Sequence, residues 1–285
     1  MHIGNHYYGH DFILAWAASI REPRAVFGYV QHGWKPEQAI HLTRRPVPGA
    51  PVFVWSRANI EPTRRAMPHR PVIAIGAPFL YLCDMLEIRG RSSPELDLLL
   101  YPCHGLGSDR LPHEVHHSLV EQVMSLRDRP TSVTVCLHPH EQGLDEVRDI
   151  YRRLPGSIFI SNWLSEPYRL AWDPTIYVRQ MTHILRHERV MSNCLTTALF
   201  YAAYLEREIR LLSHPSRRPR PTEGRGAKLH AELEAAGGGS SLAAIARHEL
   251  GEDCMLKPDV LRGTLGWHSR WRTPLARVIQ MKRRP

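Results

Sequence analysis

The chain has no closely spaced cysteine pair, no long apolar run and few lysines, and each absence excludes a class of protein. Its five cysteines lie among 285 residues without a Cys-x-x-Cys spacing, which predicts reduced, mostly buried thiols. No apolar run reaches the ~20 residues that span a bilayer. The N-terminus lacks the charged and apolar regions of a secretory signal, which predicts a cytoplasmic protein, with peripheral attachment to the inner membrane surface as an alternative.

The formal net charge of +9 is typical of proteins that bind nucleic acid by neutralising phosphates with clustered Lys and Arg. Lysine, however, occurs only at positions 35, 228, 257 and 282, and much of the excess is arginine at 217–220 and 283–284. Such runs are usually solvated. The charge pattern therefore favours a solvated tail over a nucleic-acid contact.

Several catalytic signatures are also missing. There is no Gly-x-Ser-x-Gly elbow and no cysteine in a recognisable nucleophile setting, which disfavours covalent hydrolase chemistry. The glycines of the segment His104-Gly105-Leu106-Gly107-Ser108-Asp109 have neither the dinucleotide-binding nor the P-loop spacing. Binding of nicotinamide or ATP is therefore not predicted, and no cofactor is expected.

The chain does contain an alternation of short apolar runs and amphipathic segments, which predicts an α/β fold with parallel sheets. A polar break at 89–94 separates two such series. Strands are expected at 25–31, 51–55, 72–75, 98–101, 132–136, 157–161, 189–191 and 208–212, and helices at 11–19, 79–86, 113–126, 143–153, 174–186 and 196–205.

The break at 89–94 predicts two α/β domains, over 1–90 and 91–213. Prolines, arginines and a Gly-Gly-Gly run then predict a flexible linker over 214–241, because such a composition buries little apolar surface. A helical segment over 242–285 would complete a flexible C-terminal extension.

Polar side chains follow several predicted strands. The first strand is closed by Gln31-His32-Gly33-Trp34. A histidine with a pKa near neutrality can take a proton from a hydroxyl, and the glycine lets a ligand approach closely. His32 is therefore a candidate catalytic base. A histidine that only bonds a neighbouring loop is the alternative.

The segment His138-Pro139-His140-Glu141 is a second candidate. Side chains two apart on an extended segment point the same way, so His138 and His140 could meet one phosphate. A metal site would need a third ligand such as His104, Asp109 or Glu141, and 138–141 lacks the helical His-Glu-x-x-His spacing. The pattern therefore favours a phosphate over a metal.

A third candidate is Ser192-Asn193 with Thr196-Thr197, between a predicted strand and helix. Hydroxyls and free backbone N–H groups at a helix N-terminus bind anions. Simple N-capping by Ser192 or Asn193 is the alternative.

The remaining histidines give weaker signals. His6 and His10 cluster with Asp11 before the first helix, where Asp11 could equally serve as a helix cap, and His116 and His117 fit an amphipathic surface helix. The residues that could line a ligand cleft are His6, His10, Gly33, His104, Gly105 and Glu141.

Taken in order, these pieces resemble bacterial GT-B glycosyltransferases of the CDP-glycerol glycerophosphotransferase and capsule sialyltransferase type. The motifs that carry the resemblance are Gln31-His32-Gly33-Trp34, Ile75-Gly76-Ala77-Pro78, Leu99-Leu100-Tyr101-Pro102, His138-Pro139 and Ser192-Asn193 with Thr196-Thr197. They span about residues 25–205. Ser192-Asn193 replaces the family's paired serines, and the acidic residue that precedes them in the family is absent.

The resemblance implies two Rossmann-like domains, an acceptor domain at 1–90 and a nucleotide-donor domain at 91–213. It implies metal-independent transfer of a sugar or polyol-phosphate from a nucleotide-activated donor to a hydroxyl acceptor, in polysaccharide or glycoconjugate biosynthesis. His32 would be the base, and His138, Ser192 and Thr196 would hold the donor phosphate. A nucleotide-sugar-binding protein without activity and a histidine-site metal hydrolase are the alternatives.

Overall fold

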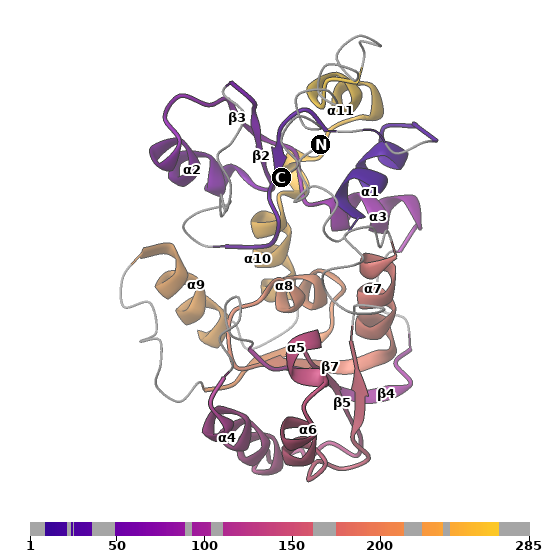
Figure 1. Ribbon diagram of the computed structural model, residues 1–285, viewed down its shortest axis with the longest axis vertical. Coiled ribbons are helices and arrows are strands. Elements are labelled where there is room, and N and C mark those ends of the chain that lie inside the picture. Colours follow the sequence, from indigo (N-terminus) through magenta and orange to yellow (C-terminus); the bar gives the residue numbers. More distant parts are fainter. Residues whose placement is uncertain are drawn as a thin grey trace. The chain divides into compact units, whose positions relative to one another are not determined.

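The computed structural model (Figure 1) describes residues 9–21, 24, 26–35, 49–88, 93–103, 111–161, 175–213, 224–235 and 240–267. It has an α/β fold with two parallel sheets, of three and five strands, which confirms the predicted fold class. The chain divides into two compact units. The first unit comprises Met1–Arg89, Leu170–Tyr177 and Arg247–Pro285, and the second comprises Gly90–Arg169 and Val178–Ala246.

The first unit contains the three-stranded sheet, in which β1, β2 and β3 lie in sequence order and are parallel. Its elements are α1 (His10–Ala17), β1 (Tyr29–Val30), β2 (Val52–Val54), the 3-10 turn η3 (Arg57–Asn59), α2 (Ile60–Ala66), β3 (Val72–Ala74), α3 (Pro78–Met85), the 3-10 turn η4 (Glu252–Cys254) and α11 (Pro258–Thr264). The helices α7 (Ile176–Arg186) and α10 (Ser240–Leu250) begin in one unit and end in the other.

The central strand of this sheet is apolar throughout. Val52, Phe53 and Val54 are fully buried, as expected for a parallel strand that is covered on both faces. Figure 1 shows α1 lying beside α3. Pro78 occupies the first turn of α3, where its missing N–H costs no helical hydrogen bond.

Residues 247–267, which composition assigns to a C-terminal extension, lie in the first unit. The Ala77 N–H donates to the Leu250 carbonyl at 2.9 Å, and the Tyr81 hydroxyl accepts from the Leu256 N–H at 2.8 Å. Gly251 packs against the end of β2, with room for no side chain. This part of the segment therefore belongs to the packing of the first unit.

The second unit contains the five-stranded sheet. Its elements are β4 (Leu96–Tyr101), α4 (His113–Met124), β5 (Val133–Cys136), α5 (Pro139–Gln142), α6 (Asp145–Tyr151), β6 (Ile158–Ile160), β7 (His187–Ser192), α8 (Thr197–Tyr204), β8 (Glu208–Leu211) and α9 (Gly224–Ala235). One face of the sheet packs on α4 and α6, which lie side by side in Figure 1. The helix α8 contacts β7 and β8.

The strand order of this sheet is β6-β5-β4-β7-β8, with every pair parallel. The chain forms β5 and β6 on one side of β4 and then β7 and β8 on the other side. The order therefore reverses between β4 and β7. In open parallel sheets, ligands bind outside the carboxyl ends of the strands at such a point of reversal. The carboxyl ends of β4 and β7 are thus the place to look for a ligand site.

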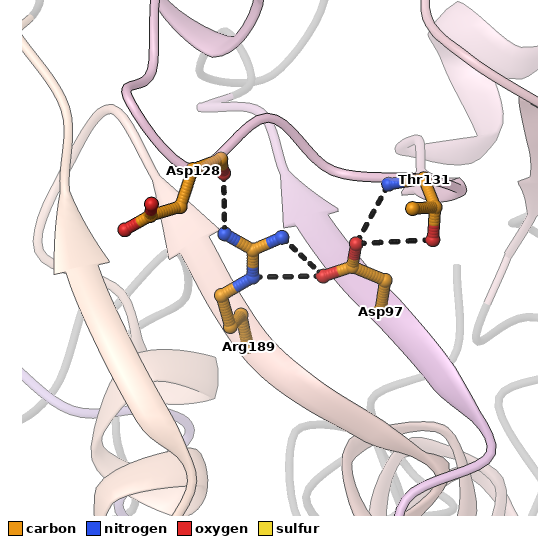
Figure 2. A network of polar contacts seen from close by, with 4 residues as sticks. All are labelled: Asp97, Asp128, Thr131 and Arg189. Carbon is orange, nitrogen blue, oxygen red and sulfur yellow. Dashed lines mark hydrogen bonds and ion pairs between the residues drawn. The ribbon is translucent and has the colours of Figure 1, made fainter.

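The opposite edge of the same sheet is held by a polar network (Figure 2). Arg189 at the start of β7 donates from Nε to Asp97 Oδ1 at 2.8 Å, forms an ion pair with the same oxygen through Nη2, and donates from Nη1 to the Asp128 carbonyl. The other carboxylate oxygen of Asp97 accepts from the backbone N–H of Thr131 at 2.7 Å. The network therefore links β4, β7 and the loop before β5.

We expect Asp97→Asn to destabilise the second unit by about 2 kcal/mol, because one charge-assisted acceptor position becomes a donor in a largely shielded network. Urea unfolding followed by circular dichroism measures the loss. The control is Asp149→Asn, which breaks a solvent-exposed pair with Arg152 and should have a much smaller effect. Equal destabilisation by the two variants would contradict a special role for Asp97.

Composition was a poor guide to the segment 214–241. Residues 224–235 form the helix α9 rather than the predicted flexible linker. The helix lies between the proline-rich and glycine-rich stretches, its Leu229 is buried, and Lys228 pairs with Glu232 one turn later.

Among the described residues, no helix combines the length and apolar character needed to cross a membrane.

Candidate functional site

In the first unit, the loop after β1 is held rigidly by Gln31. This fully buried side chain accepts from the Trp55 N–H at 2.9 Å and donates from Nε2 to the Gly33 carbonyl at 3.0 Å. One side chain thus ties the loop both to itself and to the end of β2. The loop presents His32 at the carboxyl edge of the sheet with an exposed side chain, as a base that must reach a substrate requires.

The structure brings His10 next to His32, with ring centroids 6.3 Å apart. His10 is fully buried at the start of α1, stacks on the Tyr177 ring, and shares a 2.7 Å hydrogen bond with the Tyr177 hydroxyl. Sequence reasoning missed Tyr177, because it is 167 residues from His10 and no local pattern marks it. Asp11, also buried, follows on the same helix.

Both imidazoles favour the neutral form. Burial lowers the pKa of His10 well below its ordinary value, and the neighbouring His32 adds to this effect. Crowding by protein atoms, followed by the charge of Lys35, lowers the pKa of His32. Because the His32 side chain is exposed to solvent, we expect its pKa to be lowered less than that of a buried histidine. A neutral imidazole at neutral pH is the state that can accept a proton.

In the second unit, Asn193 lies where the strand order reverses. Its Oδ1 accepts from the Cys103 backbone N–H at 2.7 Å, which joins the residues that follow β4 and β7. The residue is 3% exposed. Its Nδ2 has no hydrogen-bond partner in the described part of the chain. A buried amide donor without a partner costs free energy, so this group calls for an acceptor.

Hydroxyl groups surround Asn193 in the sequence and take different roles. Ser192 is the last residue of β7 and fully buried, and its Oγ accepts from the Cys194 N–H at 3.3 Å. Thr196 is the N-cap of α8 and accepts from the Leu199 N–H at 3.4 Å. Capping therefore falls to Thr196 and not to Ser192 or Asn193. Thr197 begins the helix and is half-buried.

His138 and His140 are not paired on an extended segment as predicted. His138 follows the end of β5 and is half-buried, but Pro139 starts the short helix α5, so the two histidines do not lie on an extended segment. The N–H groups of Glu141 and Gln142 both donate to the His138 carbonyl. Proline at the first position of a helix favours this turn over continuation of the strand. The side chain of His140 lies outside the described part.

Burial also bears on two residues near this turn, and it corrects the surface position predicted for His116. Glu141, expected among the residues that could line a cleft, is buried, and its carboxylate faces His116 in the interior. His116 is buried as well, because the period of α4 places it on the face that carries Val115, Leu119 and Val120, whereas His117 is exposed as predicted. The residues His6, His104 and Gly105 lie outside the described ranges.

A His-Glu-x-x-His spacing does occur, at His113–His117 in the first turns of α4, and reasoning confined to 138–141 missed it. Both terminal histidines are exposed, and the Arg153 guanidinium lies 3.5 Å from His117 Nδ1, where its charge disfavours a cation. Within the described ranges, no group of three or more His, Cys, Asp or Glu side chains could hold a metal ion.

The fold and these sites define an α/β protein with chemistry-bearing side chains at the carboxyl edges of two parallel sheets. A scan against protein-family models and a search of curated proteins give no match. Solved structures show a distant similarity to proteins of the GT-B fold.

One such structure is UDP-GlcNAc 2-epimerase from Neisseria meningitidis bound to UDP-GlcNAc, with 13% identity, 75% of this chain and 61% of that chain covered, and a TM-score of 0.42. A UDP-glucosyltransferase from Polygonum tinctorium matches with 13% identity, 77% and 54% coverage and a TM-score of 0.36. HepE from Anabaena, in complex with UDP and glucose, matches with 12% identity, 75% and 61% coverage and a TM-score of 0.33. The chain thus spans less than two thirds of the length of each structure.

Proposed function

We propose that the protein is a transferase that uses a nucleotide-activated donor. The second unit would bind the donor phosphates at the carboxyl ends of β4 and β7, and His32 of the first unit would take the proton from an acceptor hydroxyl. The transferred group would be a sugar or a polyol-phosphate, in polysaccharide or glycoconjugate biosynthesis. The observation that carries the proposal is the buried Asn193 amide at the point where the strand order reverses, whose Nδ2 has no hydrogen-bond partner among the residues that the structure describes.

A phosphate oxygen suits this position for three reasons. The Nδ2 of Asn193 offers a donor that no described residue uses. Capping by Thr196 leaves other N–H groups in the first turn of α8 outside the helical ladder, and the helix dipole favours negative charge there. Ser192 Oγ accepts from the Cys194 N–H and makes only a weak 3.9 Å contact with Cys194 Sγ, so its hydroxyl proton could turn to a phosphate oxygen. His138 follows β5, which is the neighbour of β4 in the sheet, and would add a further contact to the phosphate.

The chemistry then needs no covalent intermediate. His32 would remove the hydroxyl proton of the acceptor as that oxygen attacks the donor, and the bond to the nucleotide phosphate would break. Donors held in fixed positions would stabilise the negative charge that develops on the leaving phosphate. A neutral imidazole matches the role of base.

The test is thermal unfolding of the purified protein with UDP, CDP, CMP, GDP and ADP, each with and without a chelator. A nucleotide that binds the folded state raises the midpoint. We expect selective stabilisation by a uridine or cytidine nucleotide that is unaffected by chelator. Asn193→Asp, which keeps the acceptor for Cys103 but replaces the donor with a negative charge, should abolish the shift.

Ser125→Ala, an exposed change at the end of α4, serves as the control and should respond like the unmodified protein. No shift with any nucleotide, or an equal shift in Asn193→Asp, would overturn the proposal. Binding without transfer to any hydroxyl acceptor would instead favour the nucleotide-sugar-binding protein.

A further inference from the structure

A cluster of buried polar atoms lies behind the turn that carries His138. Glu141 of α5 and His116 of α4 have side chains that are 4% and 1% exposed, and their Oε1 and Nε2 atoms are 3.9 Å apart. In the described part of the chain, neither carboxylate oxygen of Glu141 nor the Nε2 of His116 has a hydrogen-bond partner. Three unsatisfied atoms in one interior cluster are costly, so the cluster needs an explanation.

The side chain that contacts the pair is neutral, and the charged side chains lie further away. The Tyr151 hydroxyl of α6 lies 2.8 Å from His116 Nδ1, and burial raises the pKa of Tyr151 well above its ordinary value, so it stays protonated. Burial, with the charges of His113 and His117, lowers the pKa of His116 to about 4. The imidazole is thus uncharged at neutral pH.

Glu141 behaves in the opposite way. Burial raises the pKa of its carboxyl group to about 7, and the backbone N–H of Leu111 acts against this shift without making a hydrogen bond of normal geometry. A protonated carboxyl group can donate its O–H to the His116 Nε2, with the imidazole Nδ1–H then donating to Tyr151. One proton therefore gives partners to two of the three atoms, one carboxyl oxygen of Glu141 and the His116 Nε2, at the cost of a small movement across the 3.9 Å gap.

We propose that Glu141 is a positioning residue: a proton shared with His116 holds α5 against α4 and α6 and so fixes the position of His138. The helices α5 and α6 are in contact. The N–H groups of Glu141 and Gln142 bond the His138 carbonyl at 2.8 and 2.9 Å, so movement of α5 displaces the backbone of His138 directly. The role of this movement in phosphate binding rests on the proposed function, whereas the movement itself does not depend on that function.

The sign of the pH effect follows from linkage. The folded protein holds the Glu141 proton more tightly than a state in which α5 has opened and the carboxyl group meets water. The contribution of Glu141 to the resistance of α5 to opening is therefore full below about pH 4.5, falls as pH rises, and is lost above about pH 7. His116, whose pKa is lowered from 6.5 to about 4, contributes the opposite slope between about pH 4 and 6.5 to the extent that opening of α5 brings water to its ring, and there it offsets the fall due to Glu141.

The test is amide hydrogen exchange of Glu141 and Gln142 across this pH range, with no nucleotide present, expressed as protection relative to an unfolded chain. Each pH unit between about pH 5 and 7 should cost the unmodified protein up to about tenfold in protection relative to Glu141→Gln, whose amide mimics the protonated acid and does not titrate. The ratio of protection in the unmodified protein to protection in Glu141→Gln should therefore fall over this range, because the contribution of His116 is common to both proteins and cancels in the ratio.

Glu146→Gln, an exposed change on α6, is the matched control and should keep the slope of the unmodified protein. The amides of Ile150 and Tyr151 report whether an effect is global. The same slope in Glu141→Gln and in the unmodified protein would overturn the proposal. Because the experiment contains no nucleotide, a failure of the proposed transferase function would leave its outcome unchanged.

Discussion

Gly251→Ala is expected to unfold the first unit. The residue has φ +75°, and an added Cβ would lie 2.0 Å from the Trp55 carbonyl oxygen, 2.7 Å from its carbon and 3.0 Å from Ser56 Cα. All three contacts are backbone atoms at the end of β2, so no side chain can turn aside. We expect a loss of about 4 kcal/mol or more, the range reserved for strain and overpacking at a fixed backbone position.

Tryptophan fluorescence during urea unfolding measures this loss, because Trp34 and Trp55 are buried in the first unit. The matched control is Gly49→Ala: this glycine has φ +72°, but no atom of the described residues lies within 4 Å of the added Cβ. It should cost only the left-handed strain, about 1 kcal/mol. Similar losses in the two variants would show that contact with β2 contributes nothing and that only the dihedral angle matters.

The sequence predicted the parallel sheets well because their strands are covered on both faces. In β4, Leu98, Leu99 and Leu100 are all fully buried, so the strand reads as an unbroken apolar run bounded by polar residues. The first strand was predicted too long, at 25–31 against the observed Tyr29–Val30. Gly28 explains the difference, since its φ of +143° breaks the extended chain just before β1.

Contacts between distant parts of the chain could not be predicted in this way. The packing of Gly251 on Trp55 and the hydrogen bond of His10 to Tyr177 join residues that share no local pattern. The same limit applies to Glu141, whose neighbours His116 and Tyr151 come from two other helices. Periodicity reports which face of an element is apolar, and it carries no information on which polar groups meet inside.

The candidate sites were predicted by position more than by role. Polar residues at strand ends marked both His32 and Asn193, because the carboxyl ends of parallel strands share one edge of a sheet. Their partners were not predicted: the Cys103 bond that orients Asn193 depends on β4 and β7 being neighbours, which only the strand order reveals. For His138, a local helical turn overrode the extended geometry that had been assumed.

Replacing His32 with alanine is expected to lower transfer by about 10²–10⁴-fold, the usual contribution of a general base. Nucleotide-induced stabilisation should be unchanged, because the proposed phosphate contacts all belong to the second unit. Once the stabilising nucleotide is known, release of that nucleotide from its sugar or polyol-phosphate donor, in the presence of hydroxyl acceptors, measures turnover. His69→Ala, an exposed histidine of the same unit, is the control and should keep full activity.

The pH dependence of turnover distinguishes a base from a residue that only maintains the loop. A base must be unprotonated, so activity falls when the pH drops below the pKa of His32. Because crowding by protein atoms and the charge of Lys35 lower that pKa, the acid limb should lie below about pH 6.5, the ordinary value for histidine. Tyr177→Phe, which removes the hydroxyl bonded to His10, should reduce turnover only several-fold and keep the acid limb, since His10 acts through packing against His32. If His32→Ala retains most of its turnover, or an acid limb of the same midpoint persists in its residual activity, another group is the base.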